Sequence, residues 1–276
     1  MILLDGKTLS QKIMTSLKEE VSNLNLNPIL DIIIVGDDLA SLKYVSMKQN
    51  QASLIGIGGT VHHLDKNSNT DDVLNLVSQL NNDKNITAFM VQLPLPSQID
   101  TSKVLSLINP QKDADGLNPL NLGLLFQKDS QPIISATALG ILKLLEEYNI
   151  DLSGKNAVII GRSSEVAIPL SALFLSKNAT TTICHSYTKN LKKICQQADI
   201  LVSSIGKPQF FTSEYIKTDA IIIDVGFTTD SNNKVSGDFD FDQVASLASF
   251  ITPVPGGVGP MTITSLLYNT IQIAKK

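Results

Sequence analysis

The chain has 276 residues, of which 43% are hydrophobic and 17% charged, and its formal net charge is −4. This length is enough for two domains with ordinary buried cores, and the negative charge argues against a general nucleic-acid or anionic-membrane binder. Neither a signal peptide nor an apolar run of the roughly 20 residues that span a bilayer is visible. We therefore expect a cytoplasmic protein that binds neither membrane nor nucleic acid, with Cys184 and Cys195 as free thiols.

Strand-like and helix-like segments alternate in the first half of the chain. Leu9, Ile13, Leu17 and Val21 recur every four residues, which is typical of an amphipathic helix. We then expect a strand over 29–35, a helix over 39–55, a strand over 60–64, a helix capped by Thr70 that runs to about Leu80, and a strand over 86–91. Such alternation predicts βαβ units and a mainly parallel sheet.

The same alternation resumes after a turn-rich loop over 109–119. We expect a helix over 137–148, strands over 156–160, 180–184, 200–203 and 220–224, and a helix after Pro260 that packs back onto the first domain. The fold class is therefore α/β, with two domains and a cleft between them. Their expected bounds are 1–135 together with 260–276, and 136–259, the second being a Rossmann-like parallel-sheet nucleotide-binding domain.

A phosphate-binding turn is predicted where the strand over 156–160 ends. Gly161-Arg-Ser163 leads into a helix, whose N-terminal amides can hold a phosphate. Ser186 follows the next strand, where NAD enzymes carry an acidic residue for the ribose, so a serine with Arg162 nearby favours the 2′-phosphate of NADP. The full G-x-G-x-x-G pattern is absent, and such a turn by itself more often marks a plain strand-to-helix connection with a solvated arginine.

Tyr44 and Lys48 are four residues apart and therefore share one face of a helix. Taken alone, such a pair is usually a surface pair. It also matches the Tyr-x-x-x-Lys pair of short-chain dehydrogenases, in which the pair follows the nucleotide motif along the chain. Here the pair precedes that motif by more than 100 residues, which excludes the short-chain family.

Three further segments have a composition that suits a ligand site. Gln92 lies in Val91-Gln-Leu-Pro-Leu-Pro96 at the end of a strand, where α/β ligand sites collect. Asp115, in Lys112-Asp-Ala-Asp-Gly116, can accept two hydrogen bonds from an amino-substituted heterocycle, although this segment is also typical of a solvated turn. The proline- and glycine-rich segment 251–262 is equally typical of an inter-domain linker and of a shaped main-chain surface for a flat ligand.

With these segments in order, the chain resembles the bifunctional methylenetetrahydrofolate dehydrogenase/methenyltetrahydrofolate cyclohydrolase (FolD) family almost from end to end. The resemblance rests on Tyr44-x-x-x-Lys48, Val91–Pro96, Lys112–Gly116, Gly161–Ser163, Asp224-Val-Gly226, Gly237-Asp238 and the highly specific Thr252-Pro-Val-Pro-Gly-Gly-Val-Gly-Pro-Met-Thr262. It implies NADP-dependent oxidation of 5,10-methylenetetrahydrofolate to the methenyl cation, followed by hydrolysis to 10-formyltetrahydrofolate. A dehydrogenase with a weak hydrolytic step, or a binding protein without catalysis, is the alternative, and the four retained residues Tyr44, Lys48, Gln92 and Asp115 speak against both.

The resemblance also implies roles for individual residues. Lys48 would be the acid–base group of the hydrolytic step, with Gln92 holding it, Tyr44 packing against the folate and Asp115 anchoring the pterin. The implied substrate-binding residues are Tyr44, Lys48, Val91, Gln92, Leu93, Asp115, Pro255, Gly256, Gly257, Val258 and Gly259. The implied cofactor-binding residues are Gly161, Arg162, Ser163, Ser186, Gly206, Phe227 and Thr262. The first domain would then bind folate and the second NADP.

The partners that the resemblance implies are tetrahydrofolates, with polyglutamylated forms left open, and a second copy of the chain in a homodimer formed through the nucleotide domains. It places the enzyme in one-carbon metabolism and purine biosynthesis. We expect no metal, because His62, His63 and His185 lack the spacing of metal ligands.

Three departures from the family pattern bear on these expectations. Ser135-Ala-Thr-Ala138 replaces the usual Pro-Cys-Thr-Pro, Ala167 replaces a glycine at the nucleotide turn, and Tyr187 stands where a basic residue is common. The last two changes leave NAD open beside NADP as the cofactor.

Overall fold

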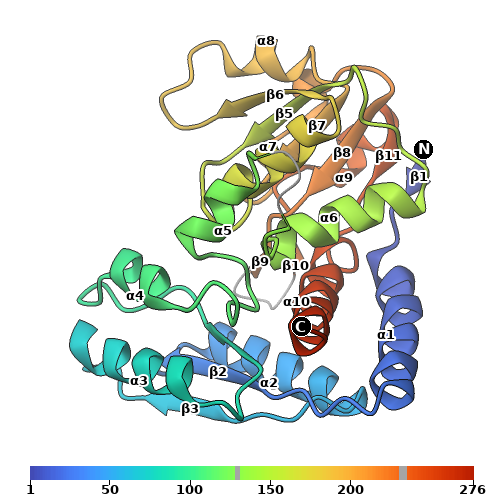
Figure 1. Cartoon of the computed structure of the whole chain (residues 1–276). Coiled ribbons are helices and arrows are strands. Elements are labelled where there is room, and N and C mark those ends of the chain that lie inside the picture. The colour runs from blue at the N-terminus through green and yellow to red at the C-terminus, as the bar shows by residue number, and fades with distance from the viewer. Residues whose placement is uncertain (128–130, 230–234) are drawn as a thin grey trace. The chain divides into compact units, whose positions relative to one another are not determined.

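The computed structural model describes residues 1–127, 131–229 and 235–276, and the chain divides into two compact units. Unit 1 comprises Met1–Gln11 with Thr137–Thr262, and unit 2 comprises Lys12–Ala136 with Ile263–Lys276. Figure 1 shows the elements of both units, coloured along the chain. The α/β fold with parallel sheets that the sequence predicts is confirmed, and each unit is described by itself below.

Among its described residues, unit 2 contains a three-stranded parallel sheet in the order β3 (Val61–Leu64), β2 (Leu30–Val35), β4 (Ala88–Val91). All six residues of the central strand β2 are buried, as is typical of a parallel strand covered on both faces. Leu30, Ile32 and Ile34 belong to one apolar cluster, while Ile33 and Val35 belong to another. The apolar residues of this strand therefore contribute to two cores.

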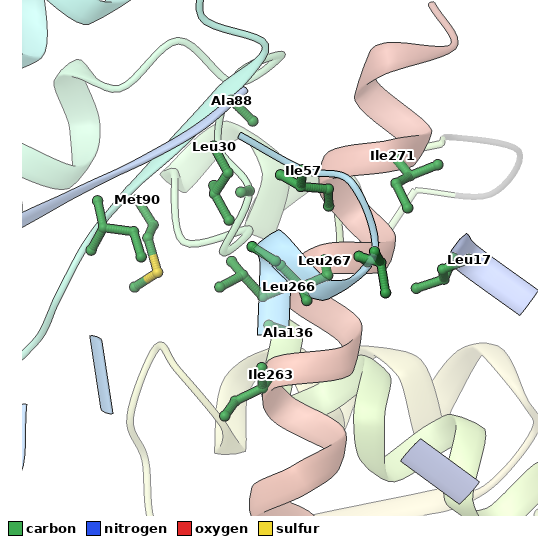
Figure 2. Packing of buried hydrophobic residues seen from close by; sticks show 14 of the residues in the cluster. Leu17, Leu30, Ile57, Ala88, Met90, Ala136, Ile263, Leu266, Leu267 and Ile271 are labelled. Carbon is green, nitrogen blue, oxygen red and sulfur yellow. The ribbon is translucent and has the colours of Figure 1, made fainter. Parts of the chain in front are cut away.

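The larger core of unit 2 joins the sheet to three helices. These are α1 (Gly6–Asn23), α2 (Leu39–Leu54) and α10 (Val258–Ala274), the last of which supplies Ile263, Leu266, Leu267 and Ile271. Figure 2 shows these four side chains of α10 gathered with Leu17, Leu30, Ile57 and Met90. The C-terminal residues of the chain thus complete a core that otherwise comes from the first half of the sequence.

The other helices of unit 2 begin at polar caps. They are α3 (Thr70–Asn82), α4 (Thr101–Leu107) and α5 (Pro119–Leu124). The predicted cap of α3 at Thr70 is wrong. Asn69 accepts hydrogen bonds from the amides of Asp71 and Asp72, and the Asp72 carboxylate accepts the Asn69 amide, which forms a capping box one residue earlier. The Thr70 hydroxyl instead accepts the Asp100 amide at 2.9 Å and so ties α3 to the start of α4.

Within the described ranges, unit 1 forms a six-stranded parallel sheet. Its order is β1 (Ile2–Leu3), β11 (Ala248–Ile251), β8 (Ala220–Asp224), β7 (Ile200–Ser203), β5 (Asn156–Ile160), β6 (Thr180–Cys184). The chain runs from β5 outward to β6 and then back across β5 to β7, so the strand order reverses at β5 and creates the switch point at which nucleotides bind in such sheets. Figure 1 shows β1, in blue, beside β11, in orange-red.

The remaining elements of unit 1 connect these strands. They are α6 (Ala136–Glu147), α7 (Ala167–Ser176), α8 (Leu191–Cys195), α9 (Phe241–Val244), a 3₁₀ turn at Ser213–Tyr215 and a small antiparallel pair, β9 (Thr228–Thr229) and β10 (Val235–Ser236). The α6 assignment begins one residue before unit 1, at Ala136. Cys184 and Cys195 are buried free thiols, as predicted.

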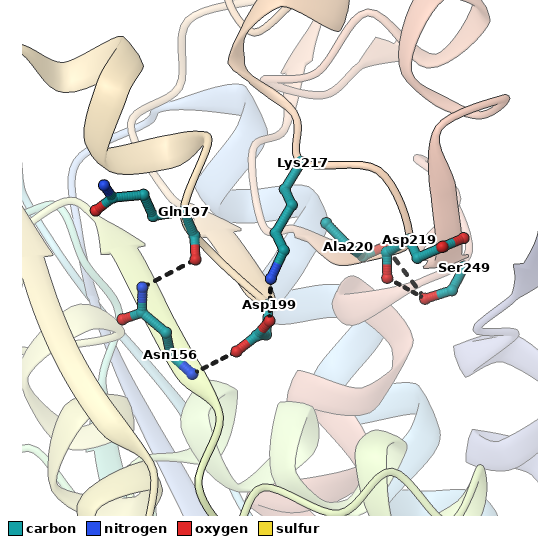
Figure 3. Close-up of polar contacts among 7 residues, drawn as sticks. All are labelled: Asn156, Gln197, Asp199, Lys217, Asp219, Ala220 and Ser249. Atoms are coloured by element: carbon teal, nitrogen blue, oxygen red, sulfur yellow. Dashed lines mark hydrogen bonds and ion pairs between the residues drawn. The ribbon is translucent and has the colours of Figure 1, made fainter.

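Polar contacts fasten the amino ends of the unit 1 strands to one another (Figure 3). The Asn156 amide at the start of β5 donates to the carboxylate of Asp199 at 2.8 Å, and Asp199 also pairs with Lys217. The Ser249 hydroxyl of β11 donates to the carbonyl of Asp219, which directly precedes β8. The sheet is therefore fixed at the end opposite to its carboxyl edge.

In the part of the chain that the structure describes, the helices are all too short or too polar to cross a membrane.

Candidate active site

Lys48 and Gln92 of unit 2 form a direct hydrogen bond. Lys48 lies on α2 with only 6% of its surface exposed. Its Nζ donates to Oε1 of Gln92 at 2.8 Å and lies 3.5 Å from Sδ of Met90. The other end of the Gln92 amide donates to the carbonyl of Leu93 at 2.6 Å, so the Gln92 oxygen is turned toward the lysine.

Tyr44 lies one turn before Lys48 on the same helix. Its ring is half-buried, and burial raises the pKa of its phenol. The buried residues of α2 are Ser41, Val45, Lys48 and Ala52, a spacing of three to four residues. A lysine therefore occupies a position that the helix pattern would ordinarily give to an apolar side chain, which marks it as a functional candidate.

Asp115 completes the group in unit 2. Burial raises the pKa of its carboxyl, and the positive charge of Lys48 acts in the opposite direction. The segment that carries Asp115 runs alongside the first half of β4, because the Phe89 amide donates to the carbonyl of Lys112 and the Ala114 amide donates to the carbonyl of Phe89. The structure thus brings together Lys48, Gln92 and Asp115, which lie far apart in the sequence.

Asp113 is a component of this site that the sequence did not single out. Its carboxylate is fully buried and accepts the amides of Gly116 and Asn118, at 3.0 and 2.7 Å, and the side-chain amide of Asn121 at 3.1 Å. Burial raises the pKa of Asp113 to about 6. The segment 112–116 is therefore not a solvated turn. The hydrogen bonds that the Asp113 carboxylate accepts fix the conformation of the loop that carries Asp115.

Two more contacts hold the same loop. Gly116 has φ of +68°, and a Cβ there would lie 2.5 Å from the carbonyl carbon of Ile134, so no other residue fits without a shift. From α10, Nδ2 of Asn269 donates to the carbonyls of Ala114 and Ile134, at 2.9 and 2.8 Å. In the sequence, Asn269 is a polar residue on the apolar face of the C-terminal helix, and this position indicates a buried hydrogen-bonding role.

The proline- and glycine-rich residues Pro255–Gly259 belong to unit 1. The Lys7 amide donates to the carbonyl of Gly256 at 2.9 Å, and a Cβ on Gly6 would lie 1.8 Å from the carbonyl oxygen of Gly257. Helix α10 begins within this segment, at Val258. A Cβ on Gly257 would lie 2.7 Å from the carbonyl oxygen of Pro253, so close packing inside unit 1 is one reason for this glycine. The assignment of Pro255–Gly259 to the substrate site stays a prediction.

The predicted cofactor residues collect mainly at the carboxyl edge of the unit 1 sheet. Gly161 follows β5 with φ of +128°, and a Cβ there would lie 2.6 Å from Oγ of Ser204, which follows β7. Ser163 holds the start of α7, because its Oγ accepts the amide of Val166 at 3.2 Å and its carbonyl accepts the amide of Ile168 at 3.1 Å. These features fit a dinucleotide whose phosphates approach the backbone closely.

Arg162 lies beside the segment that carries Ser186. Its guanidinium carbon is 5.9 Å from the ring centroid of Tyr187, within cation–π range. The Tyr187 amide donates to Nδ1 of His185, which fixes the turn after β6. Two predicted cofactor residues lie away from this turn: Phe227 follows β8 with 49% exposure, and Thr262 of α10 donates to the hydroxyl of Thr137 at 3.3 Å.

The described residues 1–127, 131–229 and 235–276 contain no group of three histidine, cysteine or carboxylate side chains placed to hold a metal ion.

Comparison with known proteins gives consistent matches over both units. The family model described as "Tetrahydrofolate dehydrogenase/cyclohydrolase, catalytic domain" matches residues 4–115, and "Tetrahydrofolate dehydrogenase/cyclohydrolase, NAD(P)-binding domain" matches residues 135–276. "Bifunctional protein FolD" of Rickettsia bellii (strain RML369-C) is 47% identical over 277 residues, which cover 99% of this chain and 98% of that protein.

Solved structures agree with these matches. The bifunctional FolD enzyme of Campylobacter jejuni superimposes with a TM-score of 0.96 at 41% identity, and covers 100% of this chain and 99% of that one. FolD from Trypanosoma brucei, complexed with NADP and an inhibitor, gives a TM-score of 0.95 at 35% identity, with 100% and 97% coverage.

The raised pKa of Asp113 predicts a specific dependence of stability on pH. A carboxyl whose folded-state pKa exceeds its unfolded value stabilises the fold fully below about pH 4 and loses this contribution as the pH rises through about 6. The free energy of unfolding of the native protein minus that of Asp113→Asn should therefore decrease by on the order of 2 kcal/mol between pH 4 and pH 7. Urea denaturation at each pH measures this difference. Asp71→Asn, at an exposed position, is the control, and a difference that stays constant with pH would contradict the raised pKa.

Proposed function

The chain belongs to the tetrahydrofolate dehydrogenase/cyclohydrolase family, and from this premise we propose that Lys48, held by Gln92, is the acid–base group of its hydrolytic reaction and that Asp115 binds the substrate beside it. The enzyme oxidises 5,10-methylenetetrahydrofolate with NADP to the 5,10-methenyl cation and then hydrolyses that cation to 10-formyltetrahydrofolate. The observation that carries the proposal is the hydrogen bond of 2.8 Å between the buried Lys48 Nζ and Oε1 of Gln92.

The hydrolytic step needs one group that can take and return a proton. Water adds to the electrophilic methenyl carbon and loses a proton, after which the C–N bond of the five-membered ring breaks and the departing nitrogen must be protonated. We assign both transfers to Lys48, since proton transfer by a positioned side chain is worth about 10²–10⁴ in rate. Gln92 holds the lysine nitrogen in one place through the hydrogen bond to Oε1.

Asp115 and Tyr44 serve binding rather than proton transfer in this proposal. A carboxylate accepts two hydrogen bonds from an amino-substituted heterocycle such as the pterin ring, and Asp115 stands beside Lys48 on a loop that Asp113 and Asn269 fix. Tyr44 packs its half-buried ring against the folate. Val91 and Leu93 flank Gln92, and together with Pro255–Gly259 they complete the proposed substrate-binding set.

The hydride step needs no protein base, because the nitrogen lone pair of the folate stabilises the cation as the hydride leaves. The chain's contribution is to bind and orient the two reactants. We propose that residues 1–135 with 260–276 form the folate-binding catalytic domain and that residues 136–259 form the NADP-binding domain. Gly161, Arg162, Ser163, Ser186, Gly206, Phe227 and Thr262 are the proposed cofactor-binding residues.

Lys48→Met tests the proposed acid–base role. Methionine keeps the length of the side chain but cannot exchange a proton, so methenyl hydrolysis should fall by about 10²–10⁴ while hydride transfer changes by less than about tenfold. Formation and decay of the methenyl absorbance in one coupled assay measure both rates. Lys43→Met, at an exposed position of the same helix, should change neither. Equal loss of both activities in Lys48→Met would count against the proposal.

Arg162 and Ser186 are proposed to recognise the 2′-phosphate of NADP, with the guanidinium supported on the ring of Tyr187. A charge-assisted contact to the phosphate exists only with NADP, so Arg162→Ala should raise the KM for NADP about 10- to 100-fold and leave the KM for NAD within about twofold. Initial rates with each cofactor measure this split. Lys189→Ala, at an exposed position nearby in sequence, is the control, and a parallel rise in both KM values would refute the assignment.

We propose that two copies of the chain associate through unit 1. Strand β6 is an edge of the six-stranded sheet, carries no charged residue over Thr180–Cys184 and exposes 37% of Ile183, so it presents free pairing groups and an apolar side chain. Ile183→Lys should shift the sedimenting species from twice the chain mass of 29.8 kDa toward the single chain. Phe241→Lys, at a residue with 38% exposure on α9, is the matched control. A single-chain mass for the native protein would refute the dimer.

We also propose a cellular compartment and a metabolic role for the enzyme. The reduced state of Cys184 and Cys195 suits the cytoplasm. There the 10-formyl product would supply carbon units for purine biosynthesis, and polyglutamylated folates would serve as substrates.

A further inference from the structure

Two buried aspartates lie against each other at the carboxyl edge of the unit 1 sheet. Asp224 ends β8 and Asp238 follows β10, with 5% and 0% of their surfaces exposed. The Asp224 carboxylate accepts the amides of Gly226, Asp238 and Phe239 at 2.9, 2.9 and 3.0 Å. Asp224 thereby fixes the main chain on both sides of Asp238.

Asp238 in turn holds the loop that follows β7. Its Oδ2 accepts the hydroxyl of Ser203 at 2.6 Å and the amide of Ile205 at 2.8 Å, while its Oδ1 accepts the amide of Lys207 at 2.8 Å. Gly206, between the two amides, has φ of +64°. Main-chain N–H groups on both sides of a left-handed residue form an anion-binding concavity, and here the protein's own carboxylate fills it.

This loop lies directly beside the proposed nucleotide turn. The Ser204 amide donates to the carbonyl of Ile160 at 3.0 Å, and Oγ of Ser204 occupies the space that a Cβ on Gly161 would need. The loop Ser203–Lys207 and the turn at Gly161 therefore stand side by side at the switch point between β5 and β7, where a dinucleotide binds in such sheets.

Steric demands around the two carboxylates account for two glycines of the sequence motifs. A Cβ on Gly237 would lie 2.0 Å from Oδ2 of Asp224, and a Cβ on Gly226 would lie 2.4 Å from Cγ of Asp238. Asp224-Val-Gly226 and Gly237-Asp238 are thus the two halves of one packed carboxylate network, in which the glycines make room for the aspartates.

We propose that Asp238 is a positioning residue for the dinucleotide: by holding the amides of Ile205 and Lys207, it sets the main chain at Gly206 in the conformation that the cofactor contacts. Asp238 itself is buried behind the loop and acts through it. The inference rests on the proposed role of Gly206 in cofactor binding. Asp238 would then act in the dehydrogenase reaction only, and its loss should leave the hydrolytic reaction at Lys48 in unit 2 intact.

Asp238→Asn tests the proposal, because an amide has one acceptor oxygen in place of the two that serve three donors. The Kd for NADP, measured by calorimetry on the complete protein, should rise about tenfold or more. Hydrolysis of the methenyl substrate without NADP should keep its kcat/KM within about twofold. Asp242→Asn, at an exposed position on α9, should change neither value. An unchanged Kd, or equal loss of NADP binding and hydrolysis, would overturn the proposal.

Two further variants keep the test decisive. If Asp238→Asn does not yield folded protein, Ser203→Ala can replace it, because this variant removes one of the three donors to Asp238. The Kd for NADP should then rise about threefold, and an unchanged Kd would overturn the proposal. Gly206→Ala strains the left-handed residue itself. If Gly206→Ala leaves NADP affinity unaltered, the cofactor role of Gly206 fails. If it weakens binding while Asp238→Asn does not, the positioning role of Asp238 fails.

Discussion

Buried aspartates that accept main-chain amides are the constraint on which both units depend. In unit 2, Asp113 collects three donors and shapes the loop that carries Asp115. In unit 1, Asp224 and Asp238 hold main-chain amides in the same way at the carboxyl edge of the sheet. A buried carboxylate without donors would be costly, so each of these loops has one conformation that satisfies it. The functional segments are therefore rigid although they are irregular.

This arrangement separates the residues that shape a site from the residues that act in it. Asp113 and Asp115 are two positions apart, yet the first is fully buried among main-chain donors while the second lies beside Lys48. Gln92 follows the same logic, since one end of its amide is held by the Leu93 carbonyl and the other end meets Lys48. Fixed geometry of this kind lowers the reorganisation that a proton transfer would otherwise require.

Much of the fold follows from the sequence, since β5, β6, β7 and β8 have the predicted bounds. Apolar runs mark the buried strands β5, β7 and β8, whereas β-branched threonines mark the edge strand β6. Strands β1 and β11 were missed, since the first has only two residues and two of the four residues of the second are only partly buried. Helical spacing correctly placed Tyr44 near Lys48. The hydrogen-bond partners of Asp113 and Asn269 could not be predicted, because most of them are backbone groups that only the folded chain brings into reach.

The C-terminal helix has a consequence for the order in which the protein is built. Ile263, Leu266, Leu267 and Ile271 close the core of a unit whose other residues end at Ala136. During synthesis, the core of unit 2 therefore stays incomplete while residues Thr137–Thr262 of unit 1 emerge from the ribosome. We expect chaperones to bind such an intermediate, because its exposed apolar surface favours aggregation. Residues that follow unit 1 in the chain thus complete the core of the first half of the sequence.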